Sequence, residues 1–137
     1  MASQRILLDT NILVRFFTGD PPDQAKRARA LIGRADEGEL TLVIPTVILA
    51  ETFYTLESFY KMPQREVADK LALFLQCRDI ESPESEIVLD ALNRCGSRNV
   101  HLSDALLAAY AAQSKIPVAS FDHDFEKFAD VTRVDVK

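Results

Sequence analysis

The sequence has few of the residues that interrupt regular secondary structure. It contains only four glycines and six prolines among 137 residues, below the combined share of about 12% that is usual in proteins. This low content argues against disordered, collagen-like and loop-dominated folds. Because a typical domain has roughly 150 residues, we predict a single domain over residues 1–137.

Cysteine and histidine are also scarce. Cys77 and Cys95 are the two cysteines, and neither has a second Cys or a His at the spacing of zinc ligands. We therefore expect two free thiols in a reducing compartment rather than a zinc site. His101 and His123 have no paired Ser or Cys nucleophile, so a catalytic triad is not predicted.

Basic residues are fewer than acidic residues, and long apolar runs are missing near the N-terminus. Lys and Arg number 16 against 21 Asp and Glu, which gives a formal net charge of −5. The overall field therefore repels nucleic acid and anionic membranes, and a phosphate-bearing partner needs local positive charge. The N-terminal segment leads into only three consecutive apolar residues, 6–8, too few for a signal sequence or a membrane span. We expect a cytoplasmic protein that does not contact a membrane.

Short apolar runs alternate with longer helical patterns along the chain. Thr46 and Ser103 are predicted helix N-caps. Strands are predicted at 5–8, 41–44, 118–120 and 131–136, and helices at about 11–17, 22–37, 46–60, 63–76, 84–95 and 103–114. Because parallel strands need long crossover connections, this alternation predicts an α/β fold with a central parallel sheet of about four to five strands and helices on both faces.

Acidic residues follow the predicted strands, where open α/β sheets bind their ligands. Asp9 ends the first strand, Glu51 lies in the helix after the second, Asp104 opens the last long helix, and Asp122 follows the third strand. The three aspartates also suit ordinary capping or turn roles. Glu51 does not, because it lies beyond the first helical turn, in a largely apolar helix with no Lys or Arg at helical spacing.

These four acids suggest a metal site. Carboxylates that pack together raise one another's pKa and need a cation to stay ionised. Oxygen-only ligand sets favour Mg²⁺ or Mn²⁺, and Mg²⁺ characteristically binds substrate phosphates through few carboxylates. Such an ion would also supply the positive field that an acidic protein lacks. We therefore predict that the four acids converge on a divalent metal at one edge of the sheet.

Four motifs occur in an order that is typical of one protein family. They are Asp9-Thr10-Asn11 after a strand, Glu51 after Val43-Ile44-Pro45-Thr46, Ser103-Asp104-Ala105-Leu106 at a helix start, and Ser120-Phe121-Asp122-His123-Asp124. Together they resemble the pattern of PIN-domain nucleases, and in order and length that of the VapC toxins of prokaryotic toxin–antitoxin pairs. The resemblance covers essentially the whole chain and implies a single PIN-like domain that cleaves RNA with Mg²⁺ or Mn²⁺.

The same resemblance implies roles for individual residues. The family's acidic quartet, catalytic and metal-binding, matches Asp9, Glu51, Asp104 and Asp122, while Asn11 and Ser120 match supporting polar positions and Asp124 a more variable acid. Among the basic residues, Arg15 is the preferred contact to an RNA backbone. Other basic candidates are Lys26, Arg27, Arg29, Arg34, Arg94 and Arg98. The resemblance also implies a homodimer or higher assembly and a cognate antitoxin.

The aromatic residues of the third predicted helix allow two interpretations. Phe53, Tyr54, Phe59 and Tyr60 could stack on nucleic-acid bases. However, Leu49, Phe53, Leu56 and Tyr60 recur at helical spacing, which favours packing in the core or against a protein partner.

Three classes of function are compatible with the sequence. The first is a metal-dependent endoribonuclease, the toxin of a type II toxin–antitoxin module. The second is a non-catalytic PIN-like domain that binds RNA or protein. The third, an Asp-based phosphoryl-transfer module, fits less well. A phosphatase of that kind would carry Asp-x-Asp where this sequence has Asp9-Thr10-Asn11, and a receiver would carry a late Lys that residues 118–124 lack.

Overall fold

The computed structural model describes residues 4–136 and contains helices and parallel strands. The strands are β1 (Gln4–Leu7), β2 (Leu40–Val43), β3 (Ile80–Glu81), β4 (Val118–Ala119) and β5 (Arg133–Val134). The helices are α1 (Thr10–Thr18), α2 (Pro22–Asp36), α3 (Thr46–Ser58), α4 (Gln64–Leu75), α5 (Ser85–Arg98), α6 (Leu102–Ser114) and the 3₁₀ helix η1 (His123–Lys127). The predicted α/β class is confirmed.

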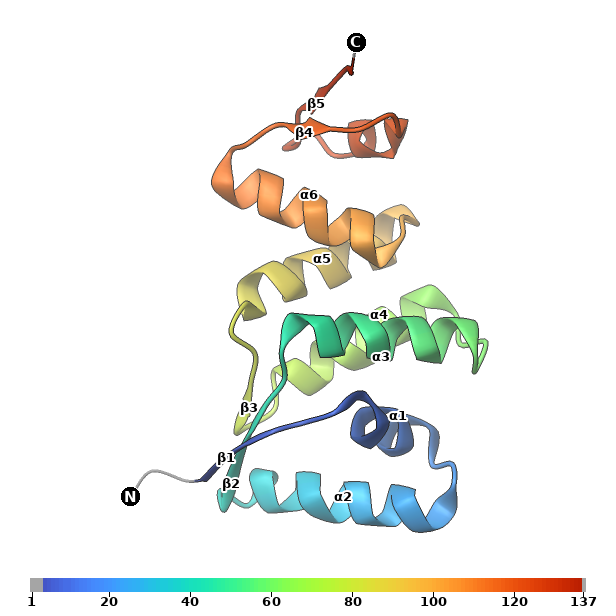
Figure 1. The fold of residues 1–137 in the computed structure, drawn as a ribbon, viewed down its shortest axis with the longest axis vertical. Coiled ribbons are helices and arrows are strands. Elements are labelled where there is room, and N and C mark those ends of the chain that lie inside the picture. Colours follow the sequence, from blue (N-terminus) through green and yellow to red (C-terminus); the bar gives the residue numbers. More distant parts are fainter. Residues whose placement is uncertain (1–3, 137) are drawn as a thin grey trace.

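All strand pairs are parallel, but the strands form two sheets in the described part of the chain. One sheet has the order β1-β2-β3, and β4 pairs with β5 in the other. The two sheets lie toward opposite ends of the molecule, with α3 to α6 between them (Figure 1). The predicted parallel strands are thus present, divided between a three-stranded and a two-stranded sheet. β4 is only two residues long and bonds to the β5 segment, with Val118 N donating to Thr132 O at 2.8 Å, whereas β1 pairs with β2.

Local sequence signals explain most helix boundaries. α1 starts after Asp9, whose carboxylate accepts a hydrogen bond from Thr10 N at 2.8 Å, and it ends at Gly19, which has a φ of 73°. Only glycine adopts this left-handed conformation without strain. α2 begins at Pro22, where the missing N–H of proline has no cost. The predicted caps Thr46 and Ser103 are wrong, because Pro45 and His101 precede α3 and α6.

The core is one continuous cluster of buried apolar side chains. β2 is buried along its whole length, and the largest fully buried side chains include Phe53 of α3 and Phe125 of η1. α4, α5 and α6 pack in succession. Truncation of a buried Phe to Ala typically costs about 3–5 kcal/mol, so Phe125 anchors η1 firmly to the rest of the molecule.

Two arginines with largely buried side chains attach the C-terminal segment. The Arg94 side chain is 11% exposed and bonds both Asp90 of α5 and Asp130, while its guanidinium lies 5.1 Å from the centre of the Phe128 ring. The second is Arg133 of β5, discussed below. Within residues 4–136, no helix combines the length and the apolar character needed to cross a bilayer.

Candidate functional site

Three aspartates come together at the junction of α6 and η1. Asp104 lies in the first turn of α6, and Asp122 and Asp124 lie at the start of η1. One carboxylate oxygen from each lies within 4.8 Å of the others. We call these three residues the acidic cluster. Two of its members, Asp104 and Asp122, belong to the predicted acidic quartet.

A tight turn holds the second half of the acidic cluster in place. Asp122 Oδ1 accepts a hydrogen bond from Asp124 N at 2.8 Å, and Ser120 Oγ accepts one from Asp122 N at 2.9 Å. Asp122 thus has the turn role that its sequence suggests and also faces two other carboxylates. Ser120, predicted as a supporting residue, shapes the turn through its hydroxyl.

Arg133 fixes the same turn from β5. Its side chain is only 7% exposed, and its Nη1 donates to Ser120 O at 2.7 Å. Other guanidinium nitrogens bond Glu126 of η1 and Asp135. A planar guanidinium with several partners is a rigid support, so Arg133 holds the backbone on which Asp122 and Asp124 stand. The sequence analysis missed this residue, because no spacing rule relates Arg133 to Ser120.

The charge of the acidic cluster is incompletely balanced. Burial raises the pKa of Asp104, and the negative charges of Asp122 and Asp124 raise it further against the opposing effect of His101. Lys127 Nζ lies 3.1 Å from Asp124 Oδ1. One ammonium therefore faces three carboxylates, and a hard divalent cation with oxygen ligands fits this donor set.

Asp9 and Glu51 lie in a different place. They line a shallow hollow between α1 and α3 with Arg15 of α1 and two aromatic residues at the end of α3. The full lining consists of Asp9, Thr10, Asn11, Val14, Arg15, Glu51, Thr55, Phe59 and Tyr60. We call it the α1–α3 hollow. Asp9 also caps α1, as its sequence position suggests.

The structure therefore divides the predicted quartet into two pairs. Within residues 4–136, neither Asp9 nor Glu51 joins a three-residue group with the spacing of the acidic cluster. The four acids thus do not form one such group in the described residues. Asp9 follows β1 and Asp122 follows β4, and these strands belong to separate sheets, so the two acids do not share one sheet edge, where the expected site would lie.

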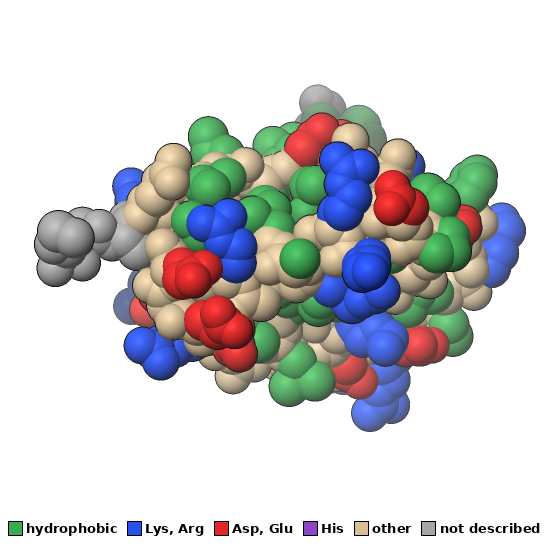
Figure 2. Space-filling model, turned by 90° about the horizontal axis from the view of Figure 1, so that it is seen from below, with side chains coloured by type: hydrophobic (Ala, Val, Ile, Leu, Met, Phe, Trp, Pro, Cys, Tyr) green, Lys and Arg blue, Asp and Glu red, His purple; other side chains and the backbone are tan. Residues whose placement is uncertain are grey.

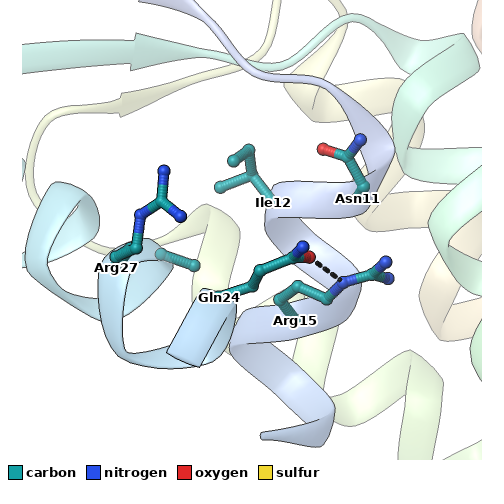
Figure 3. A pocket seen from close by; sticks show the side chains of 6 residues that line it. Asn11, Ile12, Arg15, Gln24 and Arg27 are labelled. Carbon is teal, nitrogen blue, oxygen red and sulfur yellow. Dashed lines mark hydrogen bonds between the residues drawn. The ribbon is translucent and has the colours of Figure 1, made fainter. Parts of the chain in front are cut away.

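A second depression adjoins the α1–α3 hollow. It lies between α1 and α2 and is lined by Asn11, Ile12, Arg15, Gln24, Arg27 and Ala28 (Figure 3). Asn11 and Arg15 line both depressions. Arg15 Nε donates to Gln24 Oε1 at 2.9 Å, and the terminal nitrogens of Arg15 point away from Gln24. We call this depression the α1–α2 pocket.

Three of the six other predicted basic residues are paired with acids. Arg27 lies 3.7 Å from Asp23, and Arg34 lies 3.0 Å from Glu39. On the face seen from the α2 end of the molecule, Lys and Arg side chains are interspersed with Asp and Glu (Figure 2). Arg94 is committed to its two aspartates. α2 therefore presents a mixed surface rather than a basic stripe.

The aromatic residues divide at the end of α3. Phe53 is fully buried as its spacing predicts, but α3 ends at Ser58 rather than at residue 60, and Phe59 is 76% exposed. Its ring packs edge-on against Tyr60, with ring centres 5.0 Å apart. Tyr60, the last position of the predicted helical spacing, is partly buried against the core as expected, whereas Phe59 lies outside that spacing and is exposed.

Comparison with known proteins assigns the family. The model of the PIN domain matches residues 6–131, and because this range covers most of the chain, the protein belongs to the PIN domain family. The predicted resemblance is thereby confirmed. No protein of the curated set matches the sequence. Among solved structures, the chain is similar to the crystal structure of VapBC2 from Rickettsia felis bound to a DNA fragment from their promoter. The identity is 18%, the match covers 98% of this chain and 100% of that chain, and the TM-score is 0.39.

Proposed function

We propose that this PIN domain is a metal-dependent endoribonuclease. The observation that carries the proposal is the acidic cluster: three carboxylates from two elements approach one another, and one ammonium, that of Lys127, pairs with one of them. Closely spaced carboxylates oppose folding through their mutual repulsion, and such an arrangement is typical of a functional site rather than of a stabilising one.

The donor set suits Mg²⁺ or Mn²⁺. Asp104, Asp122 and Asp124 offer only oxygen atoms, the ligand type of hard divalent ions. When bound, such an ion supplies Lewis acidity, which makes water a stronger nucleophile and offsets the charge of a phosphodiester. In this proposal Asp104, Asp122 and Asp124 hold the ion, and Ser120 and Arg133 keep the last two in position.

Asp9 and Glu51 have a complementary role in this proposal. Both are exposed in the α1–α3 hollow, where they orient water and substrate together with Asn11. The proposed reaction is hydrolysis of an RNA phosphodiester bond, in which water attacks phosphorus and the leaving oxygen departs.

We further propose that the protein is a VapC-type toxin of a type II toxin–antitoxin module. The basis is the order of its four motifs along a chain that the PIN model covers from residue 6 to residue 131. This role entails a cytoplasmic location, a cognate antitoxin that blocks the acids, and a homodimer or a larger assembly with the antitoxin.

Cleavage of RNA by antitoxin-free protein tests the proposal. End-labelled RNAs are incubated with EDTA, Mg²⁺ or Mn²⁺, using the wild type, Asp104→Asn and the control Asp69→Asn, an exposed acid of α4. We expect metal-dependent products from the wild type and the control only. Calorimetric titration with Mn²⁺ on the same preparations shows binding directly. Metal binding without cleavage of any RNA would favour the alternative, a non-catalytic RNA- or protein-binding PIN domain. Equal cleavage by Asp104→Asn would refute the site.

A further inference from the structure

Arg15 differs from most other arginines of the molecule in its partner. Arg5, Arg94 and Arg133 all bond carboxylates, whereas Arg15 bonds the neutral amide of Gln24 through Nε. Over residues 4–136, no carboxylate forms an ion pair with Arg15, and its terminal nitrogens have no hydrogen-bond partner. A guanidinium has five N–H groups, so four of them remain available on the two terminal nitrogens.

Gln24 orients this guanidinium. A bond to Nε leaves the two terminal nitrogens side by side, which is the edge that grips a phosphate or carboxylate with two parallel hydrogen bonds. Arg27 lies on the other side of the α1–α2 pocket, and the amides of Asn11 and Gln24 are also part of its lining (Figure 3). No Asp or Glu lines this pocket. Arg27 is paired with Asp23 at 3.7 Å, so the unpaired guanidinium of Arg15 is the group that favours an anion here.

Arg15 also lines the α1–α3 hollow, where the exposed ring of Phe59 lies. An exposed Phe costs solvation free energy, and its position beside an arginine is typical of sites where a base stacks next to a backbone phosphate. The Tyr60 ring packs against Phe59 and limits its movement. A base can reach this ring only if it is free of a duplex.

We propose that the two adjoining depressions bind one nucleotide unit of single-stranded RNA. The backbone phosphate lies against the terminal nitrogens of Arg15, which lines both depressions, and the neighbouring base stacks on Phe59 in the α1–α3 hollow. This inference rests on the proposed function, because it names the form of RNA that the nuclease receives: an unpaired segment, held beside Asp9 and Glu51.

Equilibrium binding in EDTA tests the inference without cleavage. The probe is a fluorescein-labelled pool of random 12-nucleotide RNA single strands, followed by anisotropy at several salt concentrations, with a hairpin duplex of equal charge as the comparison ligand. The variants are Arg15→Gln, Gln24→Ala and Phe59→Ala. Matched controls are Arg29→Gln, an exposed arginine of α2 outside both depressions, and Leu73→Ala, which is 69% exposed on α4. Thermal melts establish that each variant is folded.

The three site variants should weaken single-strand binding in different ways. Arg15→Gln should lower affinity about fivefold or more and reduce the slope of log affinity against log salt by about 0.7, the value for one phosphate contact on a single strand. Phe59→Ala should lower affinity by about 5- to 100-fold, as expected for one stacked base, and leave the salt slope unchanged. Gln24→Ala should weaken binding less than Arg15→Gln does, again without a change of slope, since no charge is removed. Duplex binding and both controls should change by less than about twofold.

The outcomes separate this inference from the proposed function. Wild-type protein that cleaves RNA while Arg15→Gln and Phe59→Ala bind normally would overturn the subsite and leave the nuclease intact. Binding with the expected pattern but no cleavage in Mg²⁺ or Mn²⁺ would support the subsite and refute the nuclease. If Arg29→Gln lost as much single-strand affinity as Arg15→Gln, the effect of Arg15 would be one of general charge. If Phe59→Ala bound RNA with unchanged affinity, the ring would be assigned to a protein contact. Either result overturns the proposal.

Discussion

The acidic cluster and the α1–α3 hollow both contain carboxylates, but the residues that surround these carboxylates differ. In the acidic cluster, Asp104 faces two further carboxylates and its pKa is raised by burial and by their charges. In the α1–α3 hollow, Asp9 and Glu51 lie with Arg15 and exposed aromatic carbon. The carboxylates of the acidic cluster repel one another and favour binding of a small cation. The α1–α3 hollow instead combines charges of both signs with an exposed aromatic ring on which a base can stack. The comparison shows that neighbours, rather than residue type, distinguish a metal site from a nucleotide site.

The largest effect should come from breaking the acidic cluster at Asp104, its half-buried member from α6. Asp104→Asn should lower metal-dependent RNA cleavage by about 1,000-fold, because the Lewis acidity of a bound ion contributes several kcal/mol to such reactions. Initial rates of the wild type and the variant at saturating Mn²⁺ check this. A reduction below tenfold would remove Asp104 from the centre of the site.

The same substitution should stabilise the metal-free protein. The pKa of Asp104 is raised in the folded state, so the ionised carboxylate favours the unfolded state at every pH above its folded pKa. Acidification through that pKa removes this unfavourable contribution. Asp104→Asn should therefore raise the melting temperature in EDTA at pH 7. This gain should shrink as the pH falls through the raised folded-state pKa, and it should be absent below the unfolded-state pKa of about 3.9. A lower melting temperature at pH 7 would show that the carboxylate is satisfied in the apoprotein.

A second pair of variants separates the two roles of Asp9 in the hollow. Asp9→Asn keeps an N-cap oxygen for Thr10 N, so its free energy of unfolding should change little. Cleavage should nevertheless fall by about 100-fold if the carboxylate takes part in the reaction. Asp9→Ala should lose both activity and about 1 kcal/mol of stability, because the cap is removed. Urea unfolding and cleavage rates measure the two effects; full activity in Asp9→Asn would confine catalysis to the acidic cluster.

Local features of both regions could be predicted from the sequence, but their relation to each other could not. The capping of α1 by Asp9 and the approach of Asp104 to Asp122 follow from strand ends and helix starts. The separation of Asp9 from Asp122 depends on which strand pairs with β1, and two-residue strands such as β3 and β4 carry almost no signal. A periodic pattern likewise cannot show where a helix stops, which is why the predicted helix 46–60 extends beyond Ser58, the last residue of α3.

Contacts between distant segments account for the remaining omissions. The Arg133 bond to Ser120 spans 13 positions, and the Arg15 bond to Gln24 depends on how α1 and α2 cross. Neither has a spacing rule, because both result from tertiary packing. Such partners are recognised only when the surrounding structure brings them together.

Arg133→Gln offers an intermediate test that affects one region without touching its acids. Loss of the guanidinium should loosen the turn that carries Asp122 and Asp124, and weaken Mn²⁺ binding by about tenfold, the usual effect of removing a supporting partner. RNA binding in EDTA should remain unchanged, since Arg15 and Phe59 lie in the other region. Calorimetry and anisotropy on one preparation measure both quantities. A parallel loss of RNA affinity would show that the regions are coupled.

The smallest effect should come from Lys127, the one basic residue that forms an ion pair with the acidic cluster within residues 4–136. Its Nζ lies 3.1 Å from Asp124 Oδ1, three positions away along η1, and both side chains are partly exposed. Pairs of this kind contribute about 0–1 kcal/mol, so an incoming ion displaces the ammonium at little cost. Lys127→Met should therefore strengthen Mn²⁺ binding by about two- to fivefold at low salt, and by less at high salt because the pair is screened. Lys70→Met, which removes a comparable pair with Glu66 on α4, should leave Mn²⁺ affinity unchanged. Weaker Mn²⁺ binding in Lys127→Met would mean that the ammonium positions Asp124 for the ion instead of competing with it.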